Sequence, residues 1–313
     1  MKILVVGAGA TGGYFGALLA RSGQDVTFLV RPRRAAELRE RTLRVVGRGS
    51  PSEEWSVAPR LVTADTLDTT YDLVLFSVKS TALEQAMEDV APAVGPDTVI
   101  VPLLNGLAHI DALNTRFGAA RVLGGVAKVV TTLDEHGDIV RLAPIAHLTI
   151  GEQDGTPTAR VEKVRSVLAE AGIDALVPED VMTSMWHKWV FITTFGAVTS
   201  LMRGTVGEVT AVPGGAELGP AVLAEAAAVA EAAGHPVPQA ERDMTLGIVT
   251  ATGSPMVPSL YRDLVAGRPT EVEHLFGDLV ARARALSVPT PLLGLATLHL
   301  RVHQARVTAT AAL

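Results

Sequence analysis

The chain has 313 residues, more than a single hydrophobic core usually covers, so two domains are expected. It carries 27 Lys and Arg residues against 33 Asp and Glu residues, a net charge of −6 with no sustained basic segment, which argues against a nucleic-acid partner. Because the chain has no cysteine, disulfide bonds, thiolate zinc sites and cysteine nucleophiles are excluded.

The segment from Ile3 to Ala20 is uncharged, follows Lys2 and ends in small residues, as signal peptides and short membrane spans do. One hypothesis is therefore that this segment directs export of the protein. Five glycines interrupt the segment, however, and a helix in lipid gains nothing from such a cluster at its start. No other segment approaches membrane length without charges. The sequence predicts a cytoplasmic protein with no membrane partner.

The first half of the chain alternates short apolar runs with helical patterns, which is typical of a parallel sheet covered by helices. Strands are expected at residues 3–6, 25–30, 73–78, 98–101, 123–132 and 139–150, the last two joined by a turn at 135–138, and helices at 12–22, 80–94 and 108–117. This order predicts an α/β fold that begins with a Rossmann-like domain containing a mostly parallel sheet.

The pattern changes after residue 151. A helix is expected at 158–171, and from Asp180, which suits an N-cap, a second helix should continue to about Met202. Prolines divide the remainder, which includes an alanine-rich helix at 221–233 and a tail after residue 301 that is a final helix or a frayed end. The predicted domains are residues 1–178, Rossmann-like, and residues 179–313, all-helical.

A glycine-rich turn follows the first strand and has the spacing G-x-G-x-x-G; its residues are Gly7, Ala8, Gly9, Ala10, Thr11 and Gly12. Such glycines permit a tight turn and close approach of a phosphate, and the amides of the following helix face the anion. The motif alone is weak, since glycine-rich turns also occur without a ligand. Its place between a buried strand and a helix favours a dinucleotide site.

Arg31 follows the second strand, about twenty residues after the glycines, where an acidic residue would bind the ribose hydroxyls of NAD. A guanidinium suits a 2′-phosphate, so NADP(H) is the predicted cofactor, with Arg33 or Arg34 as helpers. The alternative is that residues 31–34 are a solvated charge run at the start of the next helix.

Three polar residues stand where catalytic groups are expected. Lys79 and Asn105 follow predicted strands, at the edge of the sheet where such folds bind ligands, although each also suits a helix cap or turn. Lys188 lies in an apolar helix segment, where desolvation would lower the pKa of its ammonium group and suit a general acid. Its stem could instead cover apolar surface while the ammonium group reaches water.

These features together resemble the ketopantoate reductase (2-dehydropantoate 2-reductase) family in order and spacing over nearly the whole chain. The segments that carry the resemblance are the glycine motif, Arg31, Val78-Lys79, Asn105-Gly106, Trp186-His187-Lys188, and Ser259 to Asp263 continuing through Gly267 to Glu271. The part from Asp263 to Glu271 is the most specific, because neither nucleotide binding nor packing alone requires it.

The resemblance implies a role for each residue. Lys188 would donate a proton to the keto oxygen, and Glu271 would contact the cofactor or Lys188. Asn105 would touch both substrate and nicotinamide, Lys79 would lie near the cofactor ribose, and Ser259 would bind the substrate. The implied reaction is NADPH-dependent reduction of a 2-oxo acid, first of all 2-dehydropantoate to pantoate, in the pathway to pantothenate.

The sequence departs from the family at the substrate contacts. Family members that form pantoate carry asparagines that hydrogen-bond the substrate where this chain has Ile192, Gly196 and Val206. A more apolar 2-oxo acid, ketone or imine is therefore an alternative substrate. A non-catalytic NADP(H) sensor is a second alternative, although a sensor has no need for a lysine inside an apolar helix.

Other chemistries find little support in the sequence. No metal site is expected, because the histidines lack ligand spacing apart from His299 and His303, which we expect to be exposed. No G-x-S-x-G motif is present for hydrolase chemistry. Trp186 and Trp189 are expected to be core residues, and a homodimer is compatible with the sequence.

Overall fold

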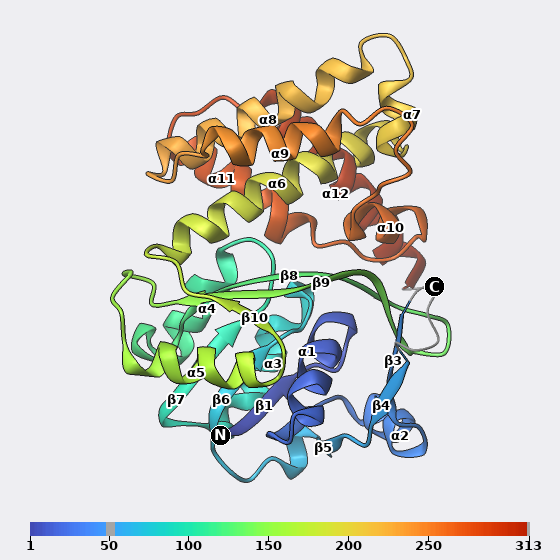
Figure 1. The fold of residues 1–313 in the computed structure, drawn as a ribbon. Helices are drawn as coiled ribbons and strands as arrows, with labels where there is room; N and C mark the ends of the chain where they lie inside the picture. The colour runs from blue at the N-terminus through green and yellow to red at the C-terminus, as the bar shows by residue number, and fades with distance from the viewer. Residues whose placement is uncertain (48–53, 312–313) are drawn as a thin grey trace. The chain divides into compact units, whose positions relative to one another are not determined.

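A computed structural model describes residues 1–47 and 54–311. The chain divides into two compact units (Figure 1). The first contains residues Met1–Leu104 and His109–Ser184, and the second contains Asn105–Ala108 and Met185–Leu313. Each unit is described by itself below.

The first unit is built on a parallel sheet with the strand order β5-β2-β1-β6-β7. The strands are β1 (Lys2–Val6), β2 (Asp25–Leu29), β5 (Arg60–Val62), β6 (Tyr71–Phe76) and β7 (Val94–Pro102). Chain order reverses between β1 and β6, which pair directly from Ile3 with Leu73 to Val6 with Phe76. In open α/β sheets, ligands bind beyond the carboxyl ends of strands at such a reversal.

A second sheet, which the sequence did not reveal, has the order β10-β9-β3-β4, with β8 paired to β9. Its strands are β3 (Leu43–Gly47), β4 (Trp55–Val57), β8 (Gly124–Leu133), β9 (Ile139–Gly151) and β10 (Asp174–Leu176). β8 and β9 run antiparallel, whereas β3 and β10 run parallel to β9. Only β8 and β9 were predicted, because the other three strands are short and their partners lie far away in the sequence.

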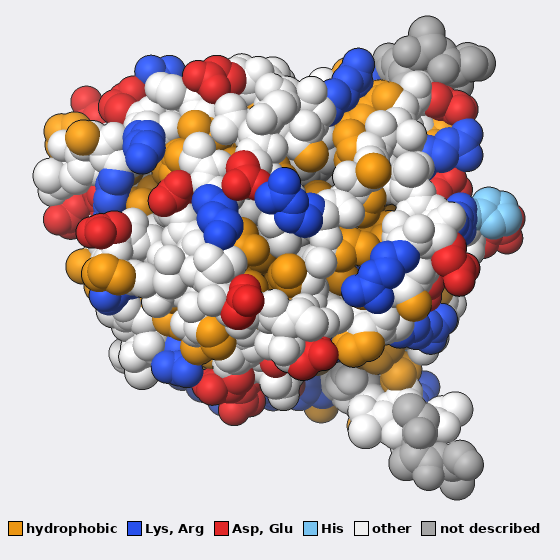
Figure 2. Space-filling view, turned by 90° about the horizontal axis from the view of Figure 1, so that it is seen from below, with side chains coloured by type: hydrophobic (Ala, Val, Ile, Leu, Met, Phe, Trp, Pro, Cys, Tyr) orange, Lys and Arg blue, Asp and Glu red, His pale blue; other side chains and the backbone are white. Residues whose placement is uncertain are grey.

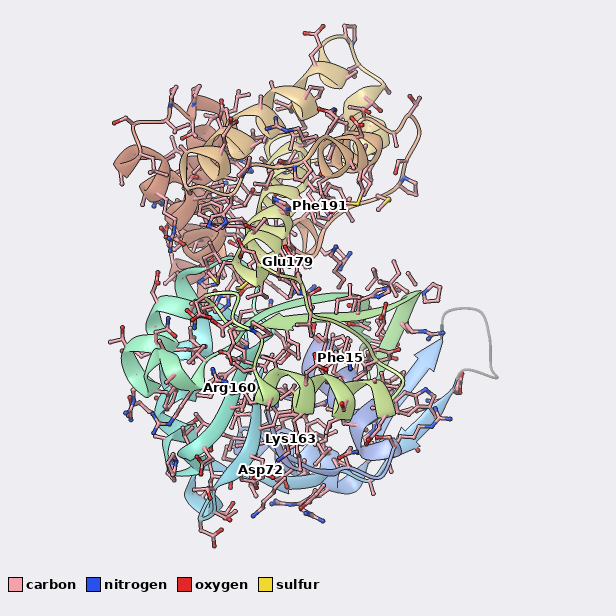
Figure 3. All side chains as sticks on the ribbon, turned by 60° about the vertical axis from the view of Figure 1, so that its left-hand side comes forward. Phe15, Asp72, Arg160, Lys163, Glu179 and Phe191 are labelled. Atoms are coloured by element: carbon pink, nitrogen blue, oxygen red, sulfur yellow. The ribbon has the colours of Figure 1, made fainter. Side chains whose placement is uncertain are left out.

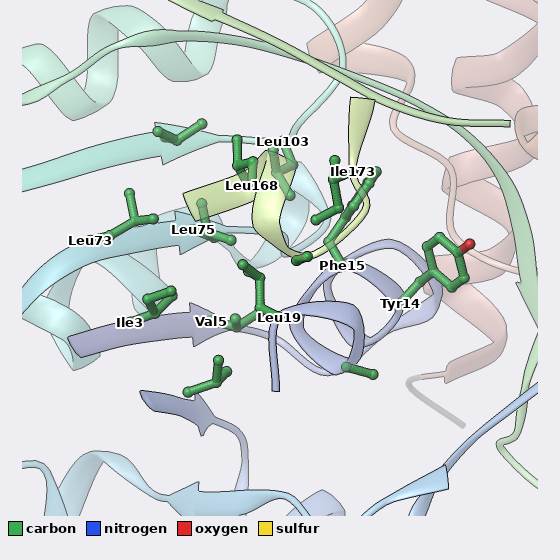
Figure 4. Packing of buried hydrophobic residues seen from close by; sticks show 14 of the residues in the cluster. Ile3, Val5, Tyr14, Phe15, Leu19, Leu73, Leu75, Leu103, Leu168 and Ile173 are labelled. Atoms are coloured by element: carbon green, nitrogen blue, oxygen red, sulfur yellow. The ribbon is translucent and has the colours of Figure 1, made fainter. Parts of the chain in front are cut away.

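Helix α1 (Ala10–Arg21) packs against residues of both sheets, and its glycines allow the close fit. A side chain at Gly16 would meet the ring of Phe28 on β2, and one at Gly13 would meet Ile139 on β9. Figure 4 shows Phe15 and Leu19 of α1 among strand residues such as Val5 and Leu75 in the core of this unit. The glycine-rich start of α1 therefore serves packing as well as the turn after β1.

The remaining helical elements of the first unit lie near their predicted places. They are α2 (Pro32–Glu40), α3 (Leu83–Val90) between the 3₁₀ turns Ser80–Ala82 and Ala91–Ala93, α4 (Ala108–Phe117) and α5 (Ala159–Glu170). The helix predicted at 80–94 is therefore three short pieces. Pro92, which lacks an N–H and cannot continue an α-helix, lies in the last of them.

The second unit is helical, as predicted, and is organised around the long helix α6 (Val181–Met202). Asp180 caps α6, since its carboxylate accepts hydrogen bonds from the Thr183 backbone N–H (2.9 Å) and hydroxyl (2.6 Å). The other helices are α7 (Val206–Thr210), α8 (Gly215–Ala232), α9 (Gln239–Val249), α10 (Ser259–Val265), the π-helix Glu273–Gly277, α11 (Asp278–Ala285) and α12 (Pro291–Ala311). The tail after residue 301 is therefore a helix as far as it is described.

Two predictions about this part need correction or comment. α8 begins at Gly215 rather than at residue 221, and Pro220 lies inside its second turn, where only one backbone hydrogen bond is lost. The domain boundary at residue 178 stays a prediction. Val181, in the first turn of α6, packs against Gly124 and Gly151 of the first unit, and Met185 is the first residue of α6 in the second unit.

The predicted fold class is confirmed: an α/β Rossmann-like part is followed by a helical part. Figure 3 shows Arg160 and Lys163 on α5 in the first unit and Phe191 on α6 in the second. Within residues 1–47 and 54–311, none of the helices is both long and apolar enough to cross a lipid bilayer.

Candidate active site

The glycine-rich loop joins β1 to α1 at the edge of the sheet where the carboxyl ends of β2, β1 and β6 meet. Gly7 N–H donates to the Leu29 carbonyl of β2, and Ser77 N–H donates to the Val6 carbonyl of β1, both at 3.0 Å. Gly7 has φ +96°, which a residue with a side chain rarely adopts. The loop is thus held between the ends of three neighbouring strands.

Two other glycines of the loop differ in what surrounds them. A Cβ at Gly12 would lie 2.4 Å from the Gly7 carbonyl oxygen and 2.6 Å from Ser77 Cβ, so a side chain there is excluded by the fold itself. A Cβ at Gly9, the N-cap of α1, would meet no protein atom within 4 Å. Packing therefore requires Gly12, whereas Gly9 leaves the amide end of α1 open to a phosphate, as the dinucleotide fingerprint requires.

Arg31 is the N-cap residue of α2, directly beyond the end of β2, and its side chain is exposed. The neighbouring arginines proposed as helpers are engaged elsewhere: Arg33 and Arg34 both pair with Glu37, at 3.1 and 3.2 Å, and Arg34 also donates to the Gly137 carbonyl. Arg31 forms no ion pair with a described residue. Of the three arginines, Arg31 is the one available for a 2′-phosphate.

We expect Arg31→Ala to weaken NADPH binding by about 10- to 100-fold and to change NADH binding little, because a charged hydrogen bond contributes about 1.5–3 kcal/mol. Fluorescence titration of both cofactors measures this. Arg33→Ala is the matched control, since the Arg33 side chain is 92% exposed and, among the described residues, forms its ion pair with Glu37. Equal losses for both cofactors would mean that Arg31 is only surface charge.

Lys79 lies two residues beyond Ser77, at the start of the 3₁₀ turn that follows β6. Its side chain is exposed, on the loop next to the glycine-rich loop at the point where chain order reverses. The sequence placed Lys79 directly after the strand, but β6 ends at Phe76 and leaves Ser77 and Val78 in the loop. Lys79 therefore lies at the same edge of the sheet as the glycine-rich loop.

Asn105 belongs to the second unit, although it follows β7 of the first. The next residue, Gly106, has φ +78° and lies against His274: a Cβ at Gly106 would be 3.1 Å from the His274 carbonyl oxygen and 3.4 Å from its ring. His274 is in the π-helix Glu273–Gly277. The loop that carries Asn105 thus packs on the π-helix.

Lys188 is half-buried on α6, and the residue after it is bound to the same π-helix. Trp189, which is fully buried, donates its indole N–H to the Leu275 carbonyl at 2.9 Å. A π-turn leaves backbone carbonyls out of the regular α-helical pattern, so the indole supplies a partner for one of them. Trp186 is also buried and stacks on His235, which confirms both tryptophans as core residues.

Glu271 is half-buried and precedes the π-helix by two residues; its carbonyl accepts from Leu275 N–H at 3.0 Å. The segment before it starts at the end of α10, where Gly267 has φ +63° and Arg268 N–H reaches back to the Asp263 carbonyl at 2.9 Å. This is a Schellman turn, which ends the helix and redirects the chain toward Glu271. The elements that carry Asn105, Lys188 and Glu271 therefore meet at one π-helix.

Ser259 opens α10 and is exposed. The next residue, Leu260, packs on α6 with Phe276 of the π-helix, because a Cβ at Gly196 would lie 3.0 Å from Leu260 and 3.2 Å from Phe276. The neighbour of Ser259, Leu260, therefore contacts α6 at Gly196, which lies two helical turns after Lys188.

The three positions at which the resemblance leads us to expect asparagines are apolar in the fold as well as in the sequence. Val206 is fully buried in a cluster with Phe195 and Val249. Gly196 is covered by Leu260 and Phe276, and Ile192 is half-buried one turn after Lys188. An asparagine would not fit at residue 196 without displacing these side chains.

The sequence missed His274, Trp189 as a hydrogen-bond donor, and the π-helix itself. A π-turn has no recognised sequence pattern, so no local signal could have revealed these contacts. The expectation that His299 and His303 are exposed was wrong: both are half-buried, and burial lowers the pKa of His299, with Arg203 acting in the same direction. Among the described residues, no group of three or more His, Asp or Glu side chains could hold a metal ion.

Two family models match this chain. The chain matches the family described as Ketopantoate reductase PanE/ApbA over residues 3–155 and its C-terminal counterpart over residues 180–304. The chain belongs to the ketopantoate reductase family. Members of this family use NADPH, and the chain is an NADP(H)-dependent oxidoreductase that acts on a keto group.

Individual relatives cover almost the whole chain. An uncharacterised oxidoreductase of Bacillus subtilis, YkpB, is 31% identical over 97% of this chain and 99% of its own length. A 2-dehydropantoate 2-reductase of Mesorhizobium japonicum is 28% identical, covering 93% and 94%. The crystal structure of 2-dehydropantoate 2-reductase from Geobacter metallireducens superposes with a TM-score of 0.87 at 30% identity, covering 96% and 99%.

The surface of this ketopantoate reductase family member is mixed in charge on the face that Figure 2 displays. Acidic and basic side chains alternate there, and neither sign forms a continuous block.

Proposed function

We propose that the chain reduces a 2-oxo acid to the 2-hydroxy acid with NADPH, and that Lys188 is the proton donor. The substrate to test first is 2-dehydropantoate, on which several relatives act by name. The observation that carries the proposal is the meeting of three elements at the π-helix: the Asn105 loop through Gly106, α6 through Trp189, and the chain segment of Glu271.

The first unit would bind the cofactor. Gly9 leaves the start of α1 open, the α1 amides suit the pyrophosphate, and Arg31 suits the 2′-phosphate. Lys79, just beyond β6, would contact the ribose. When bound, the reduced nicotinamide supplies the hydride that adds to the keto carbon.

Residues of the second unit would stabilise the negative charge that develops on the keto oxygen. Lys188 stabilises that oxygen as its negative charge grows and then transfers a proton from Nζ to it. Glu271 keeps the ammonium group charged and oriented, as a third group does in comparable sites. Asn105 orients the substrate through its amide, and Ser259 donates to the substrate.

A second candidate is a more apolar 2-oxo acid, ketone or imine. The observation that favours it is the packing of Gly196 under Leu260 and Phe276, together with the burial of Val206 in the core. These positions offer no hydrogen bond to a substrate hydroxyl, and an apolar site discriminates weakly against substrates without one.

A substrate panel distinguishes these two candidates. The absorbance of NADPH is used to measure the rate of its oxidation with 2-dehydropantoate and with branched 2-oxo acids that lack the hydroxyl group of 2-dehydropantoate. If kcat/KM for 2-dehydropantoate is at least 100-fold above the values for the hydroxyl-free acids, 2-dehydropantoate is supported as the substrate. Near-equal values of kcat/KM would favour the more apolar substrates. Turnover of none of them, with NADPH still bound, would support the sensor alternative.

A homodimer and a cytoplasmic location stay predictions from the sequence, as does a place in pantothenate synthesis. Size-exclusion chromatography with light scattering tests the dimer directly. Growth of a pantothenate-requiring strain that expresses this chain tests the pathway.

A further inference from the structure

Three side chains of α12 contact the segment that surrounds Glu271. His303 Nε2 lies 2.9 Å from the Arg268 carbonyl, and Gln304 Oε1 accepts from the Thr270 backbone N–H at 2.9 Å. Arg301 pairs with Glu273 through two contacts of 2.7 Å each. These contacts fall on both sides of Glu271, at residues 268, 270 and 273.

The contact of Gln304 is the one that directly precedes Glu271. Thr270 is 3% exposed, so its N–H is largely shielded from water, and the Gln304 oxygen is its hydrogen-bond acceptor. The Thr270 hydroxyl lies 3.5 Å from the same oxygen. A buried donor that loses its acceptor costs about 1–3 kcal/mol, which the segment would avoid by moving Thr270, and with it Glu271.

The other two contacts are weaker constraints on Glu271. The Arg301–Glu273 pair is about half exposed on both sides, and such pairs contribute about 0–1 kcal/mol. His303 binds the Arg268 carbonyl three residues before Glu271, next to the helix end that the Schellman turn already holds. Gln304 is therefore the side chain that restricts the backbone next to Glu271 most closely.

We propose that Gln304 is a positioning residue: it fixes the backbone at Thr270 so that the Glu271 carboxylate stays oriented for the reaction. The inference rests on the proposed function, because it assumes that Glu271 acts in catalysis. It extends that function to the last helix of the chain, 33 residues beyond Glu271 and outside the family motifs.

The test compares three substitutions at one position. Gln304→Met keeps the length of the side chain and removes the acceptor, and Gln304→Asn keeps the amide but is one methylene shorter. Gln304→Glu keeps an oxygen that can accept from Thr270 N–H. Arg301→Met, on the same helix, is the control for a contact that does not border Glu271.

We expect Gln304→Met and Gln304→Asn to lower kcat by about 10- to 100-fold, since small displacements of a catalytic group have effects of this size. Gln304→Glu should keep kcat within a fewfold of the value for the unmodified chain. Arg301→Met should keep kcat within about twofold of that value. In a Glu271→Gln background, Gln304→Met should cause no further loss, because the carboxylate it positions is already absent. Thermal unfolding of every variant checks that the fold is intact; if Gln304→Met does not fold, Gln304→Asn replaces it.

Two contrary results are distinguishable. If Glu271→Gln lowers kcat while neither Gln304→Met nor Gln304→Asn does, the positioning role is wrong and the role of Glu271 stands. The same conclusion follows if Gln304→Met lowers kcat equally with and without Glu271, or if Gln304→Glu fails to restore it. If Glu271→Gln has no effect, the proposed function of Glu271 is wrong, and the inference falls with it.

Discussion

Lys188→Ala should lower kcat by about 10² to 10⁴, the usual effect of removing a general acid. The affinity for NADPH should change little, because the proposed pyrophosphate and 2′-phosphate contacts lie in the first unit. Lys188→Arg should be almost as inactive: it keeps the positive charge, but a guanidinium does not give up a proton at neutral pH. Stopped-flow single-turnover kinetics separates the chemical step from binding and release.

Lys163→Ala is the matched control for that experiment. Lys163 is exposed on α5 in the first unit, a helix that carries none of the proposed site residues (Figure 3). Its removal should leave kcat within about twofold, as is usual for an exposed surface residue. A Lys188→Ala variant that kept the full kcat would remove Lys188 from the mechanism.

The second large effect is expected in the glycine-rich loop, where two Gly→Ala substitutions should behave differently. Gly12→Ala places a Cβ against Gly7 and Ser77, an overlap that should cost about 1–3 kcal/mol in the free energy of unfolding and abolish tight NADPH binding. Gly9→Ala meets no protein atom, so stability should fall only by the cost of alanine in place of glycine at an N-cap, about 0.5–1 kcal/mol. NADPH affinity should nevertheless fall at least about tenfold, because the methyl group would stand where the phosphate approaches.

Urea unfolding and NADPH titration of the two variants measure stability and binding separately. Gly247→Ala, at an exposed position of α9 where a Cβ would also meet no protein atom within 4 Å, is a further comparison for the general effect of replacing a glycine by alanine. If Gly9→Ala bound NADPH as tightly as the unmodified chain, the loop would not be the pyrophosphate site. The proposed cofactor geometry would then need another anion site.

Local patterns allowed much of the first unit to be predicted. The glycine motif, the strands beside it and the capping of α6 by Asp180 depend on residues close together in the sequence, and all lie within a few residues of their expected places. The second sheet was missed in part because β3 and β10 pair with β9 across long stretches of chain. Short strands of three to five residues carry too little periodicity to be recognised alone.

The candidate site was predictable as a set of residue types but not as an arrangement. Lys188 stood out because it interrupts an apolar helix, and Arg31 because of its spacing from the glycines. The contact of Gly106 with His274 joins residues 168 positions apart, and that of Trp189 with Leu275 joins residues 86 apart. No local pattern encodes such pairs, since they arise only when the helices pack.

The membership of residues Asn105–Ala108 in the second unit limits how relatives of this enzyme can be recombined. A chimera that takes its nucleotide-binding half from one relative and its helical half from another is naturally joined near residue 184. Such a junction would leave the Asn105 loop with the wrong parent, facing a His274 segment that did not evolve with it. Chimeras that transfer these four residues together with the helical half should retain more activity than those that exchange the halves at a single point.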